Sequence, residues 1–494
     1  MQIDELMAHS GVKFGTSGAR GLAADMTDRL CYAYTLGFLQ YLAQRGALEP
    51  GTEVGIAGDL RPSSDRIMNA CARVVTDFGL RPRNFGRIPT PALAAYGIAR
   101  GQPSLMVTGS HIPGDRNGIK FNLPDGEILK DDEAGIRAQE VLLPDDRFDP
   151  AGAFRPGTEW VLPAVESTAY DAYLRRYLEF FPPGCLEGRR VGCYEHSSVA
   201  REAFVAVLGD LGAVVERLGY SPTFVPVDTE AIRPEDQALA LAWAADGRFD
   251  ALVSADGDGD RPLVSDERGE WLRGDIAGIL CARELGVRAL ATPVSSNTAL
   301  ERSGWFDAVR RTRIGSPYVI AGMQALAAEG LAPVAGYEAN GGFLLATDLV
   351  QEGRLLPALP TRDALIVALA ILRMAKRQGR PVSRLAADLP QRFTASDRIK
   401  DFPTELSEAR LGALVTGEPA QDAAALESVF GAAFGRVTGV DTTDGVRITF
   451  TSGEIAHLRP SGNAPELRAY TEADSPERAQ SMNRLCLKIL AGWR

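Results

Sequence analysis

The chain has 494 residues, which is enough for roughly three to four domains. Hydrophobic residues make up 45% of the sequence and charged residues 24%, so a mainly disordered protein is excluded. The 53 basic and 64 acidic residues give a formal charge of −11, which disfavours non-specific binding to nucleic acid or to an anionic membrane.

The sequence contains no indication of a membrane or secretory protein. The longest purely apolar run, 364–372, is too short to span a bilayer, and residues 1–10 lack the features of a signal peptide. The six cysteines form no CxxC pair and fit a reducing compartment. With only four histidines, any metal is expected to be a hard ion held by oxygen atoms. We therefore expect a cytoplasmic protein without membrane or nucleic-acid partners.

The first part of the chain alternates short apolar runs with helical periodicity, a pattern typical of an α/β fold. In this unit we predict strands at 54–57, 83–85 and 104–107 and helices at 63–78 and 91–99. The last strand runs directly into the polar loop TGSH.

The same pattern returns twice. Strands are predicted at 189–194, 213–218 and 251–255 around a helix at 199–211, and then at 288–293 and 332–336 around a helix at 316–328. The last strands of these units lead into the polar loops DGDGD and YEANGG. Ligands of open α/β sheets bind beyond the carboxyl ends of the strands, so we expect three repeats that face one cleft.

The C-terminal part has a different pattern. The segments GRVTGV, GVRITFTSG and EIAHLRP are typical of strands joined by turns, and a helix is predicted at 475–490 with Ser475 as its cap. We therefore expect three similar α/β domains, 1–160, 161–270 and 271–388, and an α+β domain, 389–494. The segments 144–157 and 404–427 are predicted to be connecting surface.

The loop DGDGDR (256–261) carries the strongest functional signal. Asp256, Asp258 and Asp260 alternate with glycines, so their carboxylates can converge on a hard cation, with Mg²⁺ or Ca²⁺ as candidates. A solvated acidic turn is the alternative, although carboxylates this close repel one another. An EF-hand is excluded because Arg261 stands where that loop requires glycine. A phosphatase with Asp256 as nucleophile remains open.

The loop TGSHIPGDRNGIK (108–120) places Ser110 at a strand end beside His111. A serine in this position is often only a turn or cap residue. Asn117–Gly118 predicts a tight turn that returns Lys120 toward Ser110. Lys120 could then act as acid or base if a neighbouring cation depresses its pKa; otherwise it is an ordinary surface lysine.

Three further loops contain groups that suit phosphate or sugar. KFGTSGARG offers Lys13 and Arg20, and backbone N–H groups with a guanidinium suit a phosphoryl group. RPSGNAPELR is either a phosphate cradle or a polar hairpin; its candidate ligands are Arg459, Ser461, Asn463 and Arg468, with Gly462 bending the chain. In GYEANGG, Glu338 and Asn340 could bind vicinal sugar hydroxyls.

Together, the five loops resemble those of the α-D-phosphohexomutase superfamily, in which they occur in the same order. The resemblance extends from Lys13 to Arg468, and TGSH with the following NG and K looks most like bacterial phosphomannomutases and dual phosphomannomutase/phosphoglucomutases. It implies four domains around a deep cleft, three of them similar α/β units, in agreement with the pattern above.

The resemblance also implies roles for the loop residues. Ser110 would be the phosphoserine, and Mg²⁺ would be held by Asp256, Asp258, Asp260 and a phosphoserine oxygen. Arg20, Lys120 and His111 would be the other catalytic residues. Binding of the phosphosugar would fall to Lys13, Arg261, Glu338, Asn340, Arg459, Ser461, Gly462, Asn463 and Arg468.

Three positions depart from the family pattern. Asn340 stands where many members have Ser, Gly342 where they have His, and Asn463 where Thr is commoner. The missing histidine removes one candidate acid/base group and leaves the identity of the sugar open.

The expected activity is a Mg²⁺-dependent interconversion of hexose 6-phosphate and hexose 1-phosphate through a hexose 1,6-bisphosphate that also serves as activator, with mannose as the expected sugar. A mutase for glucose, or for both sugars, is the nearest alternative. A DxD-type sugar phosphatase and a non-catalytic sugar-phosphate-binding protein are alternatives of other classes. We expect a monomer or a homodimer.

Overall fold

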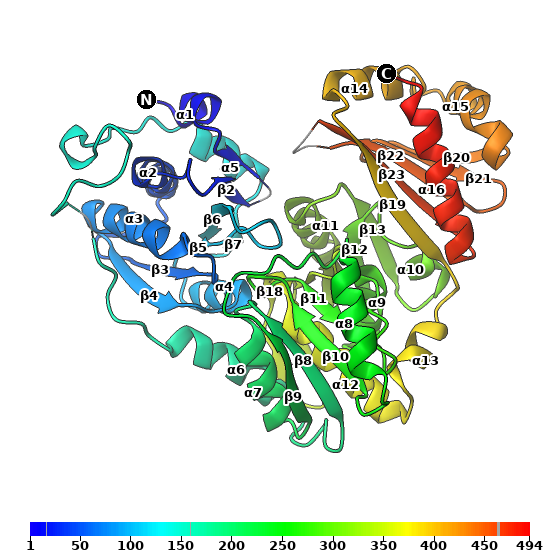
Figure 1. Ribbon diagram of the computed structural model, residues 1–494, viewed down its shortest axis with the longest axis horizontal. Helices are drawn as coiled ribbons and strands as arrows, with labels where there is room; N and C mark the ends of the chain where they lie inside the picture. The colour runs from blue at the N-terminus through cyan, green and yellow to red at the C-terminus, as the bar shows by residue number, and fades with distance from the viewer. Residues whose placement is uncertain (16, 159, 462–464) are drawn as a thin grey trace.

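The computed structural model describes residues 1–15, 17–158, 160–461 and 465–494 (Figure 1). Its four large β-sheets lie one in each of the four segments expected from the sequence, while the segment boundaries themselves stay predictions. Three of the sheets are mixed and alternate with helices along the chain, and the fourth is antiparallel. The predicted fold class is therefore confirmed.

The three α/β units repeat one strand topology. A central strand opens each unit: β3 (Glu53–Gly58), β8 (Arg190–His196) and β12 (Ala289–Pro293). A parallel strand flanks it on one side: β4 (Arg81–Gly86), β9 (Val214–Tyr220) and β13 (Ala308–Thr312). A second parallel strand flanks it on the other side: β5 (Ser104–Val107), β10 (Ala251–Ala255) and β14 (Val334–Tyr337).

An antiparallel strand then pairs with the third strand of each unit. These strands are β6 (Arg116–Leu123), β11 (Pro262–Val264) and β15 (Phe343–Leu345). The loop with Ser110 (the serine loop), the loop DGDGDR (the aspartate loop) and the loop with Glu338 and Asn340 (named the sugar loop after its predicted role) therefore occupy equivalent positions. Each connects a buried parallel strand to its antiparallel neighbour. This confirms the repeat that the sequence pattern predicted.

The predicted helices of these units are present within a few residues of their expected bounds: α3 (Ser64–Asp77), α4 (Thr90–Ile98), α7 (Arg201–Asp210) and α11 (Ser316–Ala328). The sequence analysis did not place several other helices: α1 (Ile3–Ser10), α2 (Asp28–Gln44), α5 (Lys130–Arg137), α6 (Thr168–Phe180), α8 (Pro234–Ala244), α9 (Gly274–Glu284), α10 (Ala299–Arg302), α12 (Ala364–Gln378) and α13 (Val382–Ala387). The remaining strands of this part are β1 (Lys13–Phe14), β2 (Gly18–Leu22), β7 (Gly126–Glu127), β16 (Leu349–Gln351), β17 (Arg354–Leu356) and β18 (Leu359–Asp363).

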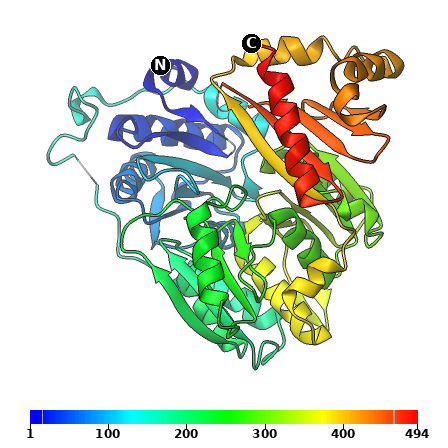
Figure 2. The ribbon, with the colours of Figure 1, turned by 45° about the vertical axis from the view of Figure 1, so that its right-hand side comes forward.

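The C-terminal unit is an antiparallel sheet covered by helices, as the α+β prediction requires (Figure 2). Its strands lie in the order β19 (Phe393–Lys400), β23 (Glu466–Ala473), β22 (Ile455–Pro460), β21 (Val446–Phe450) and β20 (Val437–Asp441). Its helices are α14 (Thr404–Gly412), α15 (Pro419–Phe434) and α16 (Pro476–Ala491). The predicted cap of α16 is confirmed, because Ser475 Oγ accepts a hydrogen bond of 3.2 Å from the backbone N–H of Arg478.

Two predictions about local structure are wrong. The segment 404–427 is not mere connecting surface but contains α14 and part of α15, because Leu411 and Leu426 are buried against the sheet. Asn117–Gly118 is not a turn but part of β6, which pairs with β2 on one side and β5 on the other. An Asn-Gly pair makes a hairpin turn only where the strands on either side pair with each other.

The six cysteines are free thiols, and five of them are buried. Among the helices of the described ranges, none combines the length and the apolar character needed to cross a bilayer.

Candidate active site

One cleft of about 1160 Å³ is lined by predicted site residues from all four segments, while the fully buried Asp256, Asp258 and Asp260 are not part of its lining. Its lining includes Lys13, Arg20, Ser110, His111, Lys120, Arg261, Glu338, Asn340, Arg459, Ser461 and Arg468. Gly462 and Asn463 lie outside the described residues. The structure thus brings together loops that are up to several hundred residues apart in the sequence, as the expectation of a common cleft required.

Ser110 follows β5 in an uncommon backbone conformation. Its φ is +58°, a left-handed value that costs a non-glycine residue on the order of 1 kcal/mol or more. The surroundings hold it there: its N–H donates to Thr108 Oγ1 at 2.7 Å, and its carbonyl accepts from Arg61 Nη2 at 3.0 Å. The hydroxyl is buried and donates to Asp256 Oδ2 at 2.5 Å. This strained turn therefore aims Ser110 Oγ at the aspartate loop.

Asp59 and Arg61 support the serine loop, and the sequence analysis missed both. They form a fully buried ion pair. Asp59 accepts from Thr108 Oγ1 at 2.7 Å, and Arg61 also donates to the carbonyl of Ile112 at 2.6 Å. Their position in the sequence could have identified them, because they follow β3 directly and therefore lie at the sheet edge where the serine loop also begins.

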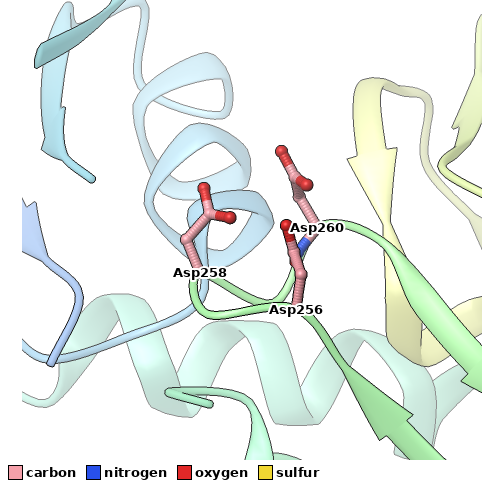
Figure 3. Close-up of side chains that lie close together, drawn as sticks. All are labelled: Asp256, Asp258 and Asp260. Atoms are coloured by element: carbon pink, nitrogen blue, oxygen red, sulfur yellow. The ribbon is translucent and has the colours of Figure 1, made fainter. Parts of the chain in front are cut away.

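The aspartate loop is a compact cluster of three carboxylates (Figure 3). One oxygen atom from each of Asp256, Asp258 and Asp260 lies within 4.8 Å of the others, and the three side chains are fully buried and point to the same side of the loop. Oδ1 of Asp258 and Oδ1 of Asp260 have no hydrogen-bond partner among the described residues. Unpaired buried carboxylate oxygens are costly, and they suit a hard divalent cation.

The aspartate loop also lies directly against the serine loop. A Cβ atom on Gly257 would be 2.8 Å from the carbonyl oxygen of Ser110, so only glycine permits this approach of the two backbones. Burial and the neighbouring carboxylates of Asp258 and Asp260 raise the pKa of Asp256 well above its usual value. The loop thus lacks enough positive charge of its own to keep all three carboxylates ionised.

Lys120 supplies part of that charge. Its Nζ donates to Oδ2 of Asp258 and to Oδ2 of Asp260, both at 2.6 Å. Burial opposes ionisation, but the two carboxylates prevail and raise the pKa of Lys120. The alternative of a surface lysine is therefore wrong. An acid/base role for Lys120 was predicted only if its pKa is depressed. While Lys120 is paired with both aspartates, its pKa is raised instead.

Two further cationic side chains, Arg20 and Arg261, line the cleft with Ser110. Burial lowers the pKa of Arg20 to about 10, and the nearby guanidinium of Arg261 adds to this shift. Arg261 Nη1 donates to His111 Nδ1 at 2.6 Å, and burial together with this cation lowers the pKa of His111 to about 3. His111 is therefore neutral at pH 7, and the proton of its ring is on Nε2.

Two pairs of like-charged side chains face one another across strands of the cleft. Lys13 and Arg20 are directly opposite in the β1–β2 pair, and Arg459 and Arg468 are directly opposite in the β22–β23 pair. Cross-strand partners project from the same face of a sheet, and like charges in this position destabilise it unless an anion lies between them. Both pairs line the cleft, and the two arginines also have carboxylate partners: Arg459 pairs with Asp444 at 2.9 Å and Arg468 with Glu466 at 3.2 Å.

The sugar loop contributes a carboxylate and an amide. Glu338 and Asn340 are buried, and Glu338 Oε2 accepts from Arg362 Nη1 at 3.3 Å. Asn340 Oδ1 accepts from the N–H of Gly342 at 2.9 Å, which fixes the turn. Arg362 is a cleft residue that the sequence analysis did not single out.

Two buried histidines are expected to make the stability of the fold depend on pH. His196 Nε2 bonds to the carbonyl of Ala255, directly before the aspartate loop, and His457 Nε2 bonds to the carbonyl of Asp444. Burial lowers the pKa of each histidine to about 4, whereas an unfolded chain has a value near 6.5.

Between pH 6.5 and pH 4 the unfolded chain therefore binds protons that the folded chain does not, so acidification lowers the free energy of unfolding. We expect a loss of roughly 2 kcal/mol per histidine between pH 6.5 and pH 5, measured by urea unfolding. His457→Gln should weaken this pH dependence, whereas His9→Gln, at an exposed position, should not. Equal stability of the wild type at both pH values would contradict the prediction.

Comparisons with known proteins agree with this architecture. Models of the phosphoglucomutase/phosphomannomutase family match residues 11–140 as alpha/beta/alpha domain I, 273–393 as alpha/beta/alpha domain III and 413–484 as the C-terminal domain. A phosphomannomutase of Salmonella muenchen is 44% identical over 96% of this chain and 95% of that protein. A phosphomannomutase of Sinorhizobium fredii is 43% identical over 97% of this chain and 99% of that protein.

A solved structure shows the same fold. The phosphoglucomutase/phosphomannomutase family protein of Burkholderia thailandensis superimposes with a TM-score of 0.72 at 19% identity, over 97% of this chain and 96% of that one. The family models and the two relatives above 40% identity place the protein in the phosphohexomutase superfamily, and its three repeated α/β units and α+β unit around one cleft agree with this. Within it, the chain belongs to the phosphoglucomutase/phosphomannomutase family.

Proposed function

We propose that this protein is a phosphomannomutase that interconverts mannose 6-phosphate and mannose 1-phosphate through a phosphorylated Ser110. The observation that carries the proposal is the hydrogen bond of Ser110 Oγ to Asp256 in the carboxylate cluster. A nucleophile, a cation site and two cationic pairs in one cleft suit phosphoryl transfer, which depends on positioning and charge neutralisation. The high identity to two phosphomannomutases supports mannose as the sugar.

In the proposed mechanism, the phosphoserine transfers its phosphoryl group to the free hydroxyl at C1 or C6 of the hexose phosphate. The P–O bond to Ser110 breaks and a bond to the sugar oxygen forms, which produces hexose 1,6-bisphosphate, and the proton of the sugar hydroxyl passes to Ser110 Oγ. The bisphosphate turns over in the cleft, and Ser110 Oγ attacks its other phosphate. The P–O bond between that phosphate and the sugar breaks, the sugar oxygen takes up the serine proton, and the isomeric hexose phosphate leaves. Arg20 and Lys120 neutralise the transferring group, and Glu338 and Asn340 hold the sugar hydroxyls.

The aspartate loop would hold Mg²⁺ through Asp256, Asp258, Asp260 and an oxygen of the phosphoserine. The donor set fits, because it consists of oxygen atoms and leaves two buried carboxylate oxygens without a partner. The bound ion would supply positive charge to the transferring phosphoryl group.

Intact mass spectrometry of the purified protein tests the proposal directly. One phosphoryl group mapped to Ser110 is expected. A phosphatase with Asp256 as nucleophile would instead release inorganic phosphate steadily and tolerate the loss of Ser110. A binding protein would show no turnover and no phosphorylated serine. Because mannose and glucose differ only at the C2 hydroxyl, kinetics with both 1-phosphates decides the sugar.

The cross-strand arginines should grip the phosphate that is not transferred. We expect Arg468→Ala to lower kcat/KM about ten- to a hundredfold, because a charge-assisted phosphate contact contributes about 1.5–3 kcal/mol. The variant should also release more hexose 1,6-bisphosphate, since the intermediate must be gripped again after it turns. Unchanged kcat/KM without extra release would mean that β22 and β23 form only a polar hairpin.

A further inference from the structure

Arg362 lies where three segments of the chain meet at the cleft. It is 2% exposed, and its guanidinium contacts a carboxylate from each of the three α/β units. Nε and Nη2 lie 3.1 Å from Asp260 Oδ2 in the metal loop, and Nη1 lies 3.3 Å from Glu338 Oε2 in the sugar loop. Nη2 lies 3.9 Å from Oε1 of Glu127, which comes from β7 of the first unit.

The backbone that carries Arg362 is held firmly from behind. The next residue, Asp363, caps the N-terminus of α12 and accepts from the N–H of Leu365 at 3.1 Å. The carboxylate of Asp363 also accepts hydrogen bonds from the hydroxyls of Tyr173, at 2.8 Å, and Tyr177. The position of the guanidinium is therefore set by the packing of α6 and α12 rather than by a mobile loop.

Gly342 provides the space for this side chain. A Cβ atom on Gly342 would lie 2.6 Å from both Cγ and Cδ of Arg362, closer than carbon atoms can pack. The stem of Arg362 therefore occupies the volume that any side chain at position 342 would need. Arg362 can therefore adopt this position because residue 342 is a glycine.

We propose that Arg362 is a positioning residue that couples the metal loop to the sugar loop. This proposal rests on the function proposed above for the cleft. Arg362 orients the carboxylate of Glu338 to accept hydrogen bonds from sugar hydroxyls. Together with Lys120 it occupies Oδ2 of Asp260. Oδ1 has no hydrogen bond and only an ion-pair contact of 3.7 Å with Arg261 Nε, so it remains available to a cation.

The positive charge of Arg362 should have opposite effects on ligand binding at the two loops. The positive charge of Arg362 strengthens the hold on the sugar through Glu338, but it opposes a divalent cation at Asp260, since like charges repel strongly in a buried site. Removal of the charge should therefore weaken sugar-phosphate binding and at the same time strengthen cation binding. General damage to the structure would weaken both.

The test compares Arg362→Met and Arg362→Lys with the wild type. Calorimetry with Mn²⁺ alone measures cation binding, and steady-state kinetics with mannose 1-phosphate gives KM and kcat. For Arg362→Met we expect KM to rise about tenfold or more, as for the loss of a buried charge-assisted contact, while Mn²⁺ binds severalfold more tightly. Arg362→Lys keeps the charge but cannot fork onto two carboxylates, so KM should rise while Mn²⁺ affinity stays near that of the wild type.

Arg373→Met is the matched control. Arg373 is a buried arginine of α12 that also bridges two carboxylates, those of Glu284 and Glu352, but it does not line the cleft. Its replacement should lower thermal stability without changing KM or Mn²⁺ affinity. If Arg362→Met does not fold, Arg362→Lys decides the question through its KM.

A double-mutant cycle tests the packing argument. Gly342→Ala should displace Arg362 and raise KM about as much as Arg362→Ala does. In the double variant the two effects should not add, because Arg362→Ala removes the atoms that Gly342→Ala would touch. Additive effects would show that the two positions act independently and would overturn this part of the proposal.

The proposal is overturned if KM of Arg362→Met stays within twofold of the wild-type value, or if its Mn²⁺ affinity falls together with sugar-phosphate binding. Failure of the proposed function is a different result: the wild type would show no turnover with any hexose phosphate. Calorimetric binding of Mn²⁺ and of mannose 1-phosphate to the wild type and to Arg362→Met would then still test the coupling.

Discussion

Replacement of Ser110 by alanine is expected to reduce mutase turnover by roughly a thousandfold or more, because it removes the only covalent carrier of the phosphoryl group in the proposed mechanism. Binding of mannose 1-phosphate should largely survive, since the cationic pairs and the sugar loop do not depend on Ser110 Oγ. Turnover is measured with mannose 1-phosphate and a trace of hexose 1,6-bisphosphate, and binding by calorimetry.

Ser104→Ala provides the matched control. Ser104 is a buried serine on β5, the strand that leads into the Ser110 loop, and its hydroxyl accepts a hydrogen bond of 3.0 Å from Asn122, away from the cleft lining. This variant should keep wild-type turnover and carry the same phosphoryl group on Ser110. Wild-type turnover in Ser110→Ala would end the phosphoserine mechanism.

Disruption of the aspartate loop should have the second large effect. We expect Asp258→Asn to lower turnover by roughly a hundredfold or more, because a buried site built from three carboxylates loses a charged ligand for its cation. Treatment of the wild type with a chelator should abolish turnover, and added Mg²⁺ should restore it.

The control for this loop is Asp266→Asn. Asp266 is also buried, ten residues after Asp256, but its carboxylate accepts from Arg268 and from backbone N–H groups instead of joining the cluster. The Asp266→Asn variant should therefore keep wild-type activity and its dependence on Mg²⁺. Full activity of chelator-treated wild type without any divalent ion would contradict a metal-dependent mechanism.

The repeated architecture was predictable from the sequence because it depends on local pattern. Apolar runs of strand length followed by polar, glycine-containing loops recur three times, and the structure shows that each such loop joins a parallel strand to an antiparallel one. Ligands of such sheets bind beyond the carboxyl ends of the strands, so the place of each loop at a strand end was foreseeable. Ser110 and the aspartate loop belong to different sheets, however, so their contact depends on the packing of two separate units and could not be predicted.

Local sequence signals gave wrong predictions where strand pairing or burial against residues distant in the chain determined the structure. Asn117–Gly118 is a strong turn signal, yet pairing with Arg20 and Gly21 of β2 holds this segment extended. The acidic composition of 404–427 suggested surface, yet a narrow apolar stripe that includes Leu411 and Leu426 is buried. In both cases, the deciding contacts are made with residues far away in the chain.

The sequence by itself determined the order of the loops, the chemistry of their side chains and the family to which they point. Only the tertiary structure decided which charges meet: Lys120 between two aspartates, Arg61 behind Ser110, and Arg362 in the space beside Gly342. The physical reason is that motif residues follow one another along a strand–loop pattern, whereas ion pairs form between side chains brought together by packing of separate units. Their pairing, and with it the pKa of Lys120, is a property of the assembled cleft.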